Sequence, residues 1–250
     1  MTKISILFDV DGVLTLPITS ERQISIPDVE LFLLLEKLYL NGIKFSLITG
    51  RAFPWVKKFI LPVLKCEIPI YLEYGLVSYH NNNITILNDG EDFKNKYHAS
   101  ILNNIRNHSN KKQLIFDLTK YIDYPDHGSL WIEDKISMIS IAANKNISVS
   151  QCHSIVEKAI EPLKSEINFF KHHLGCDILP LGWTKEMAAK HAQEIIDPKN
   201  NTDLWLVFGD NESDREMCKP LANVIFIDTK NGASEKTKQE LKHYFADILV

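Results

Sequence analysis

The chain has 250 residues, enough for one large domain or two smaller ones around a sizeable hydrophobic core. Its formal net charge of −4 argues against a nucleic-acid-binding protein, which usually carries a basic surface. No apolar run approaches the length of a membrane span, and no signal-peptide pattern opens the chain. The four cysteines form no CxxC pair and match no zinc template, which indicates reduced thiols. We therefore expect a cytoplasmic protein that binds neither nucleic acid nor membrane.

Strands and helices alternate in the first third of the chain. The continuous apolar run Lys3–Val10 is typical of a strand that is buried on both faces. A helix is expected at Pro27–Asn41, with proline in its first turn and a glycine after its end. A strand at Lys44–Ile48, a helix at Pro54–Lys65 and a strand at Pro69–Glu73 follow. This alternation predicts βαβ units and a parallel sheet.

The pattern changes after Tyr79. The stretch HNNNITILNDGED predicts a turn, a short strand and a second turn. Helices and strands of less regular order follow it, namely helices at Phe93–His108 and Ser148–Leu163 and strands at Ser129–Glu133, Ile136–Ala143, Ile167–His172 and Asp177–Leu179. The strands at Ser129–Glu133 and Ile136–Ala143 are close enough in sequence to form a hairpin. This part of the chain therefore predicts an α+β insert with an antiparallel sheet.

The first pattern returns near residue 181. The expected elements are helices at Thr184–Ile196, Asp214–Lys219 and Ala233–Leu249 and strands at Asp203–Phe208 and Val224–Asp228. We therefore predict a core domain made of residues 1–79 and 181–250, with an inserted domain of residues 80–180.

Polar residues follow several of the predicted core strands. In an open parallel sheet, ligands bind beyond the carboxyl ends of the strands. The residues expected at this edge are Asp9, Asp11, Thr49, Gly50, Arg51, Asp210 and Asp214, together with Lys185 at the start of a helix. Four aspartates without histidine or cysteine favour a hard cation, and Mg²⁺ fits best because it accepts carboxylates, waters and a phosphate. A lysine and a hydroxyl beside that cation suit a phosphate group, and an aspartate can attack phosphorus.

Four segments carry a family resemblance. FDVDGVLT, LITGR, the lysine of GWTKEMAAK, and FGDNESD resemble the four ordered motifs of the haloacid dehalogenase (HAD) superfamily of phosphohydrolases. The insert resembles the C2-type cap of the Cof-like and sugar-phosphate phosphatase branch. The resemblance implies an α/β fold, with a HAD-like Rossmannoid parallel-sheet core and an inserted α+β cap.

The resemblance also implies a role for each motif residue. Asp9 is expected to be the nucleophile and Asp11 the general acid and base. Gly12 allows the chain to turn so that both carboxylates face the pocket. Thr49 and the amide of Gly50 are expected to bind phosphate oxygens.

The remaining motif residues are expected to neutralise the phosphate or to bind the metal. Lys185 would neutralise the phosphate and Asp9, and Asp210 would ligate Mg²⁺ together with Asp9 and the backbone carbonyl of Asp11. Asp214 would support the metal or orient Lys185. Arg51 fits either a phosphate contact or a surface salt bridge.

Some positions depart from the family pattern or lie outside its motifs. Ser213 stands where relatives often have asparagine, and Tyr74 stands where Cof-like relatives often have asparagine. Val13 replaces a frequent threonine. In the insert, Lys171 and His172 are candidates for contact with the leaving group, and structural roles are the alternative.

The sequence thus favours a Mg²⁺-dependent phosphomonoester hydrolase, monomeric or homodimeric. We expect its substrate to be a small phosphorylated metabolite, either a sugar phosphate or a phosphoglycerate-type compound, cleaved through an aspartyl-phosphate. One alternative is a phosphomutase of the phosphomannomutase type, which would isomerise a hexose phosphate without releasing phosphate. A second alternative is a catalytically retired metabolite-binding protein, which would bind a phosphorylated metabolite without hydrolysing it.

Overall fold

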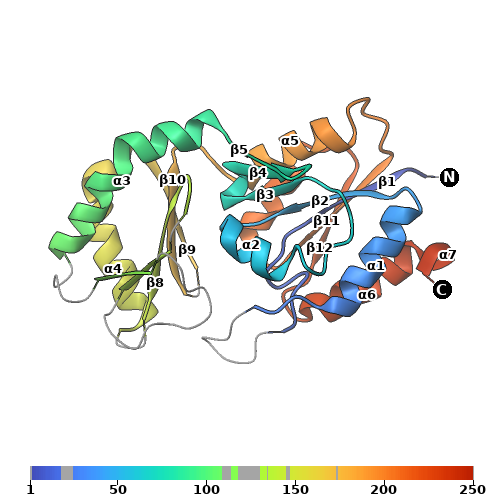
Figure 1. The fold of residues 1–250 in the computed structure, drawn as a ribbon, viewed down its shortest axis with the longest axis horizontal. Helices are drawn as coiled ribbons and strands as arrows, with labels where there is room; N and C mark the ends of the chain where they lie inside the picture. The colour runs from blue at the N-terminus through green and yellow to red at the C-terminus, as the bar shows by residue number, and fades with distance from the viewer. Residues whose placement is uncertain are drawn as a thin grey trace. The chain divides into compact units, whose positions relative to one another are not determined.

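Two sheets organise the chain, each in its own unit (Figure 1). The computed structural model describes residues 2–17, 25–108, 114–117, 130–133, 135–144, 147–172 and 174–249. The larger unit consists of Met1–Thr85 and Thr184–Val250, and the smaller unit is Ile86–Trp183. The domain division made from the sequence, at residues 79/80 and 180/181, stays a prediction that lies near these limits.

The larger unit is built on a seven-stranded sheet with the order β12-β11-β1-β2-β3-β4-β5. The five strands from β12 to β3 run parallel, and β4 pairs antiparallel with β3. The strands are β1 (Ile4–Phe8), β2 (Lys44–Ile48), β3 (Ile70–Leu72), β4 (Val77–His80), β5 (Asn83–Ile86), β11 (Leu204–Gly209) and β12 (Val224–Asp228). The strand order reverses at β1, which lies between β2 and β11. In open parallel sheets, ligands bind beyond the carboxyl ends of the strands at such a switch point.

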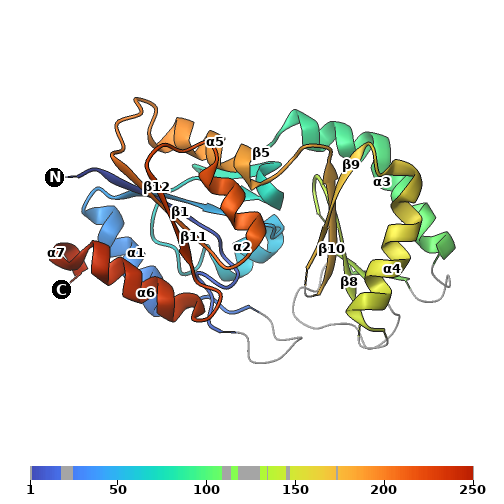
Figure 2. The same ribbon diagram turned by 180° about the vertical axis from the view of Figure 1, so that it is seen from behind.

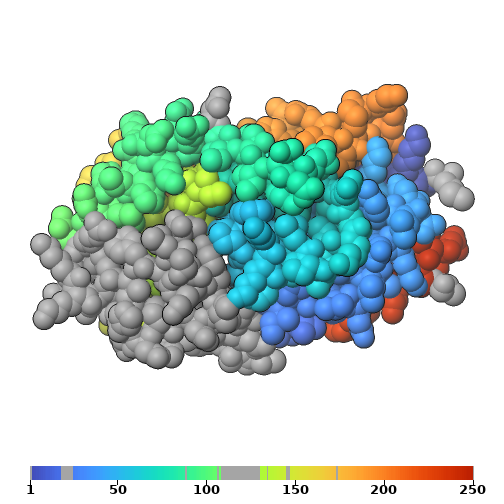
Figure 3. Space-filling model, in the orientation of Figure 1, coloured from blue at the N-terminus to red at the C-terminus, as the bar shows by residue number. Residues whose placement is uncertain are grey.

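Helices cover both faces of this sheet (Figures 1 and 2). One group of helices lies on one face, and its first member, α1, packs against its last two members, α6 and α7. This group is α1 (Val29–Leu40), α2 (Phe53–Phe59), α6 (Ala233–Tyr244) and α7 (Ala246–Leu249). On the other face, α5 (Lys185–Ile196) contacts the 3-10 helix η4 (Glu212–Cys218). Figure 3 shows α2, in light blue, at the surface of this unit.

Local sequence explains why these elements form. The core strand β1 is buried at four of its five positions, as a continuous apolar run between two helical layers requires. Asp28 caps α1 by accepting hydrogen bonds from the N–H groups of Glu30 and Leu31. Thr184 caps α5 in the same way, through the N–H of Glu186. This cap fixes the first turn of α5, where Lys185 lies.

The smaller unit is a five-stranded sheet with two long helices on one face. Its strands are arranged β6-β7-β8-β10-β9, and all pairs except β6/β7 are antiparallel. The strands are β6 (Leu114–Asp117), β7 (Leu130–Glu133), β8 (Ile139–Ala143), β9 (Ile167–Lys171) and β10 (Gly175–Pro180), and the helices are α3 (Asn88–His108) and α4 (Val149–Ile160), followed by the 3-10 helix η3 (Glu161–Leu163). A separate hydrophobic core joins the helices to β7, β8, β9 and β10.

Several elements differ from the sequence expectations. The turn expected in the segment NDGED is instead the first turn of α3, where Asp89 and Glu91 favour the positive end of the helix dipole. The helix expected to continue to Lys65 ends at Phe59, because Pro62 lacks an amide hydrogen and breaks the helical hydrogen-bond pattern. Strands β4 and β6 were not predicted, and the last helix is divided at Phe245.

The predicted fold class is confirmed: an α/β core with a mainly parallel sheet, and an inserted α+β domain. Cys66, Cys152, Cys176 and Cys218 are all free thiols. Among the described helices, none combines the length and the apolar character needed to cross a bilayer.

Candidate active site

Polar residues follow the carboxyl ends of five core strands directly. Asp9 follows β1, Thr49 follows β2, Glu73 follows β3, Asp210 follows β11 and Thr229 follows β12. Parallel neighbours in one sheet place these ends at the same edge. The larger unit therefore gathers the motif residues at one edge of its sheet.

A buried ion triad lies at this edge. The ammonium Nζ of Lys185 is 2.6 Å from Oδ1 of Asp9 and 2.6 Å from Oδ1 of Asp214. The relative exposures are 4% for Lys185, 3% for Asp9 and 0% for Asp214. Burial alone would lower the pKa of Lys185, but the two carboxylates outweigh it and hold that pKa above its usual value. Lys185 is therefore a permanent cation between two acids.

The turn after β11 fixes Asp214. Its Oδ2 accepts hydrogen bonds from the N–H groups of Asp210 (2.9 Å) and Asn211 (3.0 Å). The side chain of Asn211 in turn accepts the N–H of Ser213, so that Asn211 and Asp214 form a reciprocal helix cap. Gly209 is required here, because an added Cβ would lie 2.3 Å from Cβ of Asp214. The sequence GDNESD thus specifies a turn that points one carboxylate inward.

Three carboxylates could share a cation. One oxygen each from Asp9, Asp210 and Asp214 lies within 4.8 Å of the others. Burial, with the neighbouring aspartates adding to it, raises the pKa of Asp9 well above its ordinary value. Burial and the charge of Asp214 raise the pKa of Asp210 to about 6. The single positive charge of Lys185 does not balance three clustered carboxylates, and an all-oxygen donor set suits a hard cation such as Mg²⁺.

Asp11 has a different environment. Its side chain is not part of the three-carboxylate cluster; it accepts two hydrogen bonds from Arg51, at 2.9 Å from Nε and 2.8 Å from Nη2. Burial alone would raise the pKa of Asp11, but the charge and hydrogen bonds of Arg51 outweigh it and lower this pKa to about 2. The guanidinium also lies 4.7 Å from the ring centroid of Trp55. Asp9 and Asp11, two residues apart, therefore have opposite pKa shifts.

The loop after β2 contains a buried hydroxyl, that of Thr49, followed by a glycine, Gly50. Thr49 has no exposed surface, its N–H donates to the carbonyl of Tyr71 (2.8 Å), and its Oγ1 accepts the N–H of Arg51 (3.1 Å). A Cβ added to Gly50 would come within 3.0 Å of Cε2 of Tyr74. A residue with a side chain would therefore crowd the aromatic ring beside this loop.

Two groups at the site were not predicted from the sequence. Tyr74 lies 5.7 Å, measured from its ring centroid, from Nζ of Lys185. Thr229 donates a hydrogen bond from Oγ1 to the carbonyl of Gly12 (2.8 Å) and from its N–H to the carbonyl of Gly209 (2.9 Å). Thr229 thus ties the loop after β1 to the loop after β11. Thr229 directly follows a core strand, as Thr49 does, and this position could have identified it from the sequence.

The two candidates of the insert have ionic partners within the smaller unit. Lys171 ends β9 and is paired with Glu157, whose Oε1 is 2.7 Å from Nζ. The next residue, His172, has Nε2 3.8 Å from Oδ1 of Asp177 and accepts the N–H of Leu174 at Nδ1. Both belong to the smaller unit, which has its own neighbours and core.

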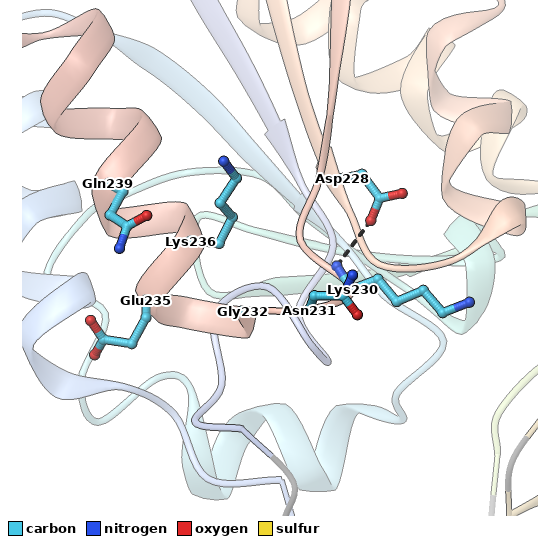
Figure 4. Close-up of a pocket in the computed structure, with 7 residues that line it drawn as sticks. All are labelled: Asp228, Lys230, Asn231, Gly232, Glu235, Lys236 and Gln239. Atoms are coloured by element: carbon cyan, nitrogen blue, oxygen red, sulfur yellow. Dashed lines mark hydrogen bonds between the residues drawn. The ribbon is translucent and has the colours of Figure 1, made fainter.

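A surface pocket of about 560 Å³ lies elsewhere, where β12 leads into α6 (Figure 4). Its lining carries both signs of charge and consists of Asp228, Lys230, Asn231, Gly232, Glu235, Lys236 and Gln239. Within it, Oδ1 of Asp228 accepts the N–H of Lys230 (2.9 Å). Glu235 and Lys236 form ion pairs along α6. None of the motif residues lines this pocket, so we do not place the chemistry there.

Comparison with known proteins identifies the family. The model of the haloacid dehalogenase-like hydrolases matches residues 6–247. The chain therefore belongs to the haloacid dehalogenase-like hydrolases. The predicted resemblance to this superfamily is confirmed, and the chain is a hydrolase of this family. No curated protein shows significant sequence similarity to the chain.

Solved structures share the fold at low sequence identity. A protein of Thermoplasma acidophilum is 17% identical, with a TM-score of 0.63 and 98% of each chain covered. The sucrose-phosphatase of Synechocystis sp., solved with sucrose and phosphate, is 13% identical, with a TM-score of 0.59 and 100% of each chain covered. The C-terminal domain of trehalose-6-phosphate phosphatase from C. albicans is 17% identical, with a TM-score of 0.65, covering 87% of this chain and 73% of that one.

Proposed function

We propose that the protein is a Mg²⁺-dependent phosphomonoester hydrolase that acts on a small phosphorylated metabolite through an aspartyl-phosphate. The observation that carries this proposal is the buried triad of Asp9, Lys185 and Asp214, with Asp210 beside it. Phosphoryl transfer needs positioning and charge neutralisation more than covalent help from the protein. The site supplies an oxygen nucleophile, a fixed cation and a set of metal ligands at one sheet edge.

Asp9 is the proposed nucleophile. One carboxylate oxygen attacks phosphorus, and the bond from phosphorus to the substrate's ester oxygen breaks, with its electron pair leaving on that oxygen. The hydrogen bond from Lys185 to Oδ1 holds the carboxylate in one orientation. Lys185 also offsets negative charge as the phosphoryl group approaches, which lowers the repulsion between two anions.

Asp11 is the proposed proton carrier. It gives a proton to the leaving oxygen, then takes one from the water that attacks phosphorus and releases Asp9. While Arg51 binds both of its oxygens, Asp11 stays ionised. The acid role therefore requires Arg51 to move from Asp11 to the phosphate or the leaving group when substrate binds, which lets the pKa of Asp11 rise.

Phosphate oxygens would contact Thr49, Gly50, Arg51 and Lys185. Gly50 lies against the ring of Tyr74, with no room for a side chain of its own, and the hydroxyl of Thr49 retains a proton to donate. Asp9, Asp210 and Asp214 would hold Mg²⁺, together with the backbone carbonyl of Asp11. The metal, when bound, neutralises phosphate charge and favours the ionised form of Asp9.

We propose a sugar phosphate or a phosphoglycerate-type compound as the substrate. The fold is shared with a sucrose-phosphatase and with trehalose-6-phosphate phosphatases, which supports a phosphorylated sugar. We assign contact with the leaving group to the insert, with Lys171 and His172 as candidates. An exposed cation at Lys171 would favour an anionic leaving group such as a glycerate.

The proposal is tested with a generic aryl phosphate and the purified protein, with Mg²⁺ or with EDTA. Hydrolysis is expected only with Mg²⁺, and Asp9→Asn is expected to lower kcat by about a thousandfold or more, because the amide cannot act as a nucleophile. The melting temperature of the variant serves as the folding control. Full activity of Asp9→Asn would contradict the mechanism, and a panel of phosphorylated metabolites then identifies the substrate by phosphate release.

A further inference from the structure

We propose that Tyr74 is a positioning residue of this active site, whose ring holds the ammonium group of Lys185 and closes the site beside Gly50. This inference rests on the proposed function and deepens it. Three observations carry it: a strained backbone, the loop and the helix that hold this backbone, and the location of the ring.

The backbone around Tyr74 is left-handed over three consecutive residues. Glu73 has a φ of 51°, Tyr74 a φ of 60° and ψ of 22°, and Gly75 a φ of 93°. Residues with a side chain rarely adopt this region, and a bulky aromatic residue does so least readily. Such a conformation persists only where the surroundings fix it, and it occurs most often at functional sites.

Two parts of the site hold this turn in place. The N–H of Tyr74 donates to the carbonyl of Thr49 (3.0 Å), and the N–H of Glu73 donates to the carbonyl of Arg51 (3.3 Å). On the other side, a Cβ added to Gly75 would come within 2.5 Å of Cβ of Ala188. Ala188 lies one turn after Lys185 on α5. The turn is therefore fitted between the proposed phosphate loop and the helix that carries the lysine.

The ring of Tyr74 faces the same two features. It lies against Gly50, and Nζ of Lys185 is 5.7 Å from its centroid, within the range of a cation–π interaction. Lys185 donates to Asp9 and Asp214, which accounts for two of its three ammonium protons. A ring face attracts the cation without competing for these protons as a third carboxylate would. The strained turn thus places an aromatic ring where it stabilises Lys185 and excludes water from it.

Three variants separate the ring from the hydroxyl and from the strain. Tyr74→Phe keeps the ring, Tyr74→Leu keeps apolar bulk and the same backbone strain but has no π face, and Tyr74→Gly relieves the strain. We expect Tyr74→Phe to keep kcat within about twofold, and Tyr74→Leu and Tyr74→Gly to lose about tenfold, the loss typical of a partly buried cation–π contact. The affinity for inorganic phosphate with Mg²⁺, measured by calorimetry, should fall in parallel.

Asn223→Gly is the matched control. Asn223 has a φ of 49°, is exposed, and belongs to the loop before β12. Glycine there makes the same kind of change at a left-handed position and should leave kcat unchanged. Melting temperatures of all variants show that the assays report on folded protein.

The outcomes distinguish this inference from the proposed function. If the wild type hydrolyses the aryl phosphate and Tyr74→Leu matches it in kcat and in phosphate affinity, the positioning role is wrong. Equal losses in Tyr74→Phe and Tyr74→Leu would assign the effect to the hydroxyl and overturn the role of the ring. If the wild type hydrolyses nothing, the proposed function fails, while weaker phosphate binding by Tyr74→Leu but not Tyr74→Phe still supports the positioning role.

Discussion

The aspartate site of the larger unit and the candidate pair of the insert differ in how their charges are held. Asp9 and Lys185 are 176 positions apart in sequence, yet they are buried together and directly bonded. Lys171 and His172 are adjacent in sequence, at least partly exposed, and paired with neighbours in their own unit. Buried charges must be paired, whereas an exposed ion pair contributes little to stability. Burial with complementary charge therefore identifies the site more reliably than residue type.

Among the variants that compare the two units, the largest effect is expected from Asp214→Ala. The variant removes a partner of buried Lys185 and leaves the N–H groups of Asp210 and Asn211 without their acceptor. Breaking a buried ion pair costs about 3–5 kcal/mol, and kcat should fall by about a hundredfold or more because Lys185 is no longer oriented. Denaturant unfolding and aryl phosphate hydrolysis measure the two effects.

Ile141→Ala is the comparison for that variant in the insert. Ile141 is fully buried in the insert's own core, and its truncation should cost about 2–5 kcal/mol. Hydrolysis of the aryl phosphate should change by no more than about threefold, because no charged group of the proposed site is touched. Equal losses of activity in the two variants would remove the distinction between the units.

A smaller effect is expected from pH and Mg²⁺ on the stability of the folded protein. The pKa values of Asp9 and Asp210 are raised in the folded protein, that of Asp210 from 3.8 to about 6. Between these pH values the folded protein holds protons that the unfolded chain has lost, so this site makes metal-free stability fall as pH rises. Mg²⁺ at a hundred times its dissociation constant should restore about 2.7 kcal/mol, and a fixed Mg²⁺ concentration should stabilise more at pH 7.5 than at pH 5, because protons compete with the metal.

Melting temperatures with Mg²⁺ and with EDTA check this behaviour. Asp210→Asn removes one of the raised carboxylates, so it should weaken both the pH dependence and the response to Mg²⁺. An unchanged response to Mg²⁺ in this variant would contradict the assignment of Asp210 as a ligand.

The smallest effects are expected in the insert. Lys171→Ala and His172→Ala should each leave aryl phosphate hydrolysis within about twofold, because Lys171 loses an exposed ion pair with Glu157 and His172 a long contact of 3.8 Å with Asp177. With the natural substrate, we expect KM to rise while kcat is nearly unchanged, since a leaving-group contact of this kind acts in binding. Unchanged KM for every phosphorylated metabolite that the wild type hydrolyses would remove both residues from the proposed site.

Sequence reasoning located the core strands and the residues that follow them, because each buried strand is a short apolar run that ends in polar residues. It could not find the turn at Glu73–Gly75, whose left-handed backbone depends on contacts with Thr49 and Ala188. It also left Arg51 between two roles. The structure pairs Arg51 with Asp11, a contact between positions 40 residues apart that no local pattern encodes.

The position of β1 between β2 and β11 also affects the order of assembly. Ile4 pairs with Leu204, so β1 lacks one of its two neighbours until the insert and β11 have been synthesised. The insert, by contrast, is continuous from Ile86 to Trp183, and all its strands are synthesised before β11. Contacts between residues so distant in sequence form late and slowly. On the ribosome, Asp9 is synthesised before the whole insert, and its partner Lys185 only after it.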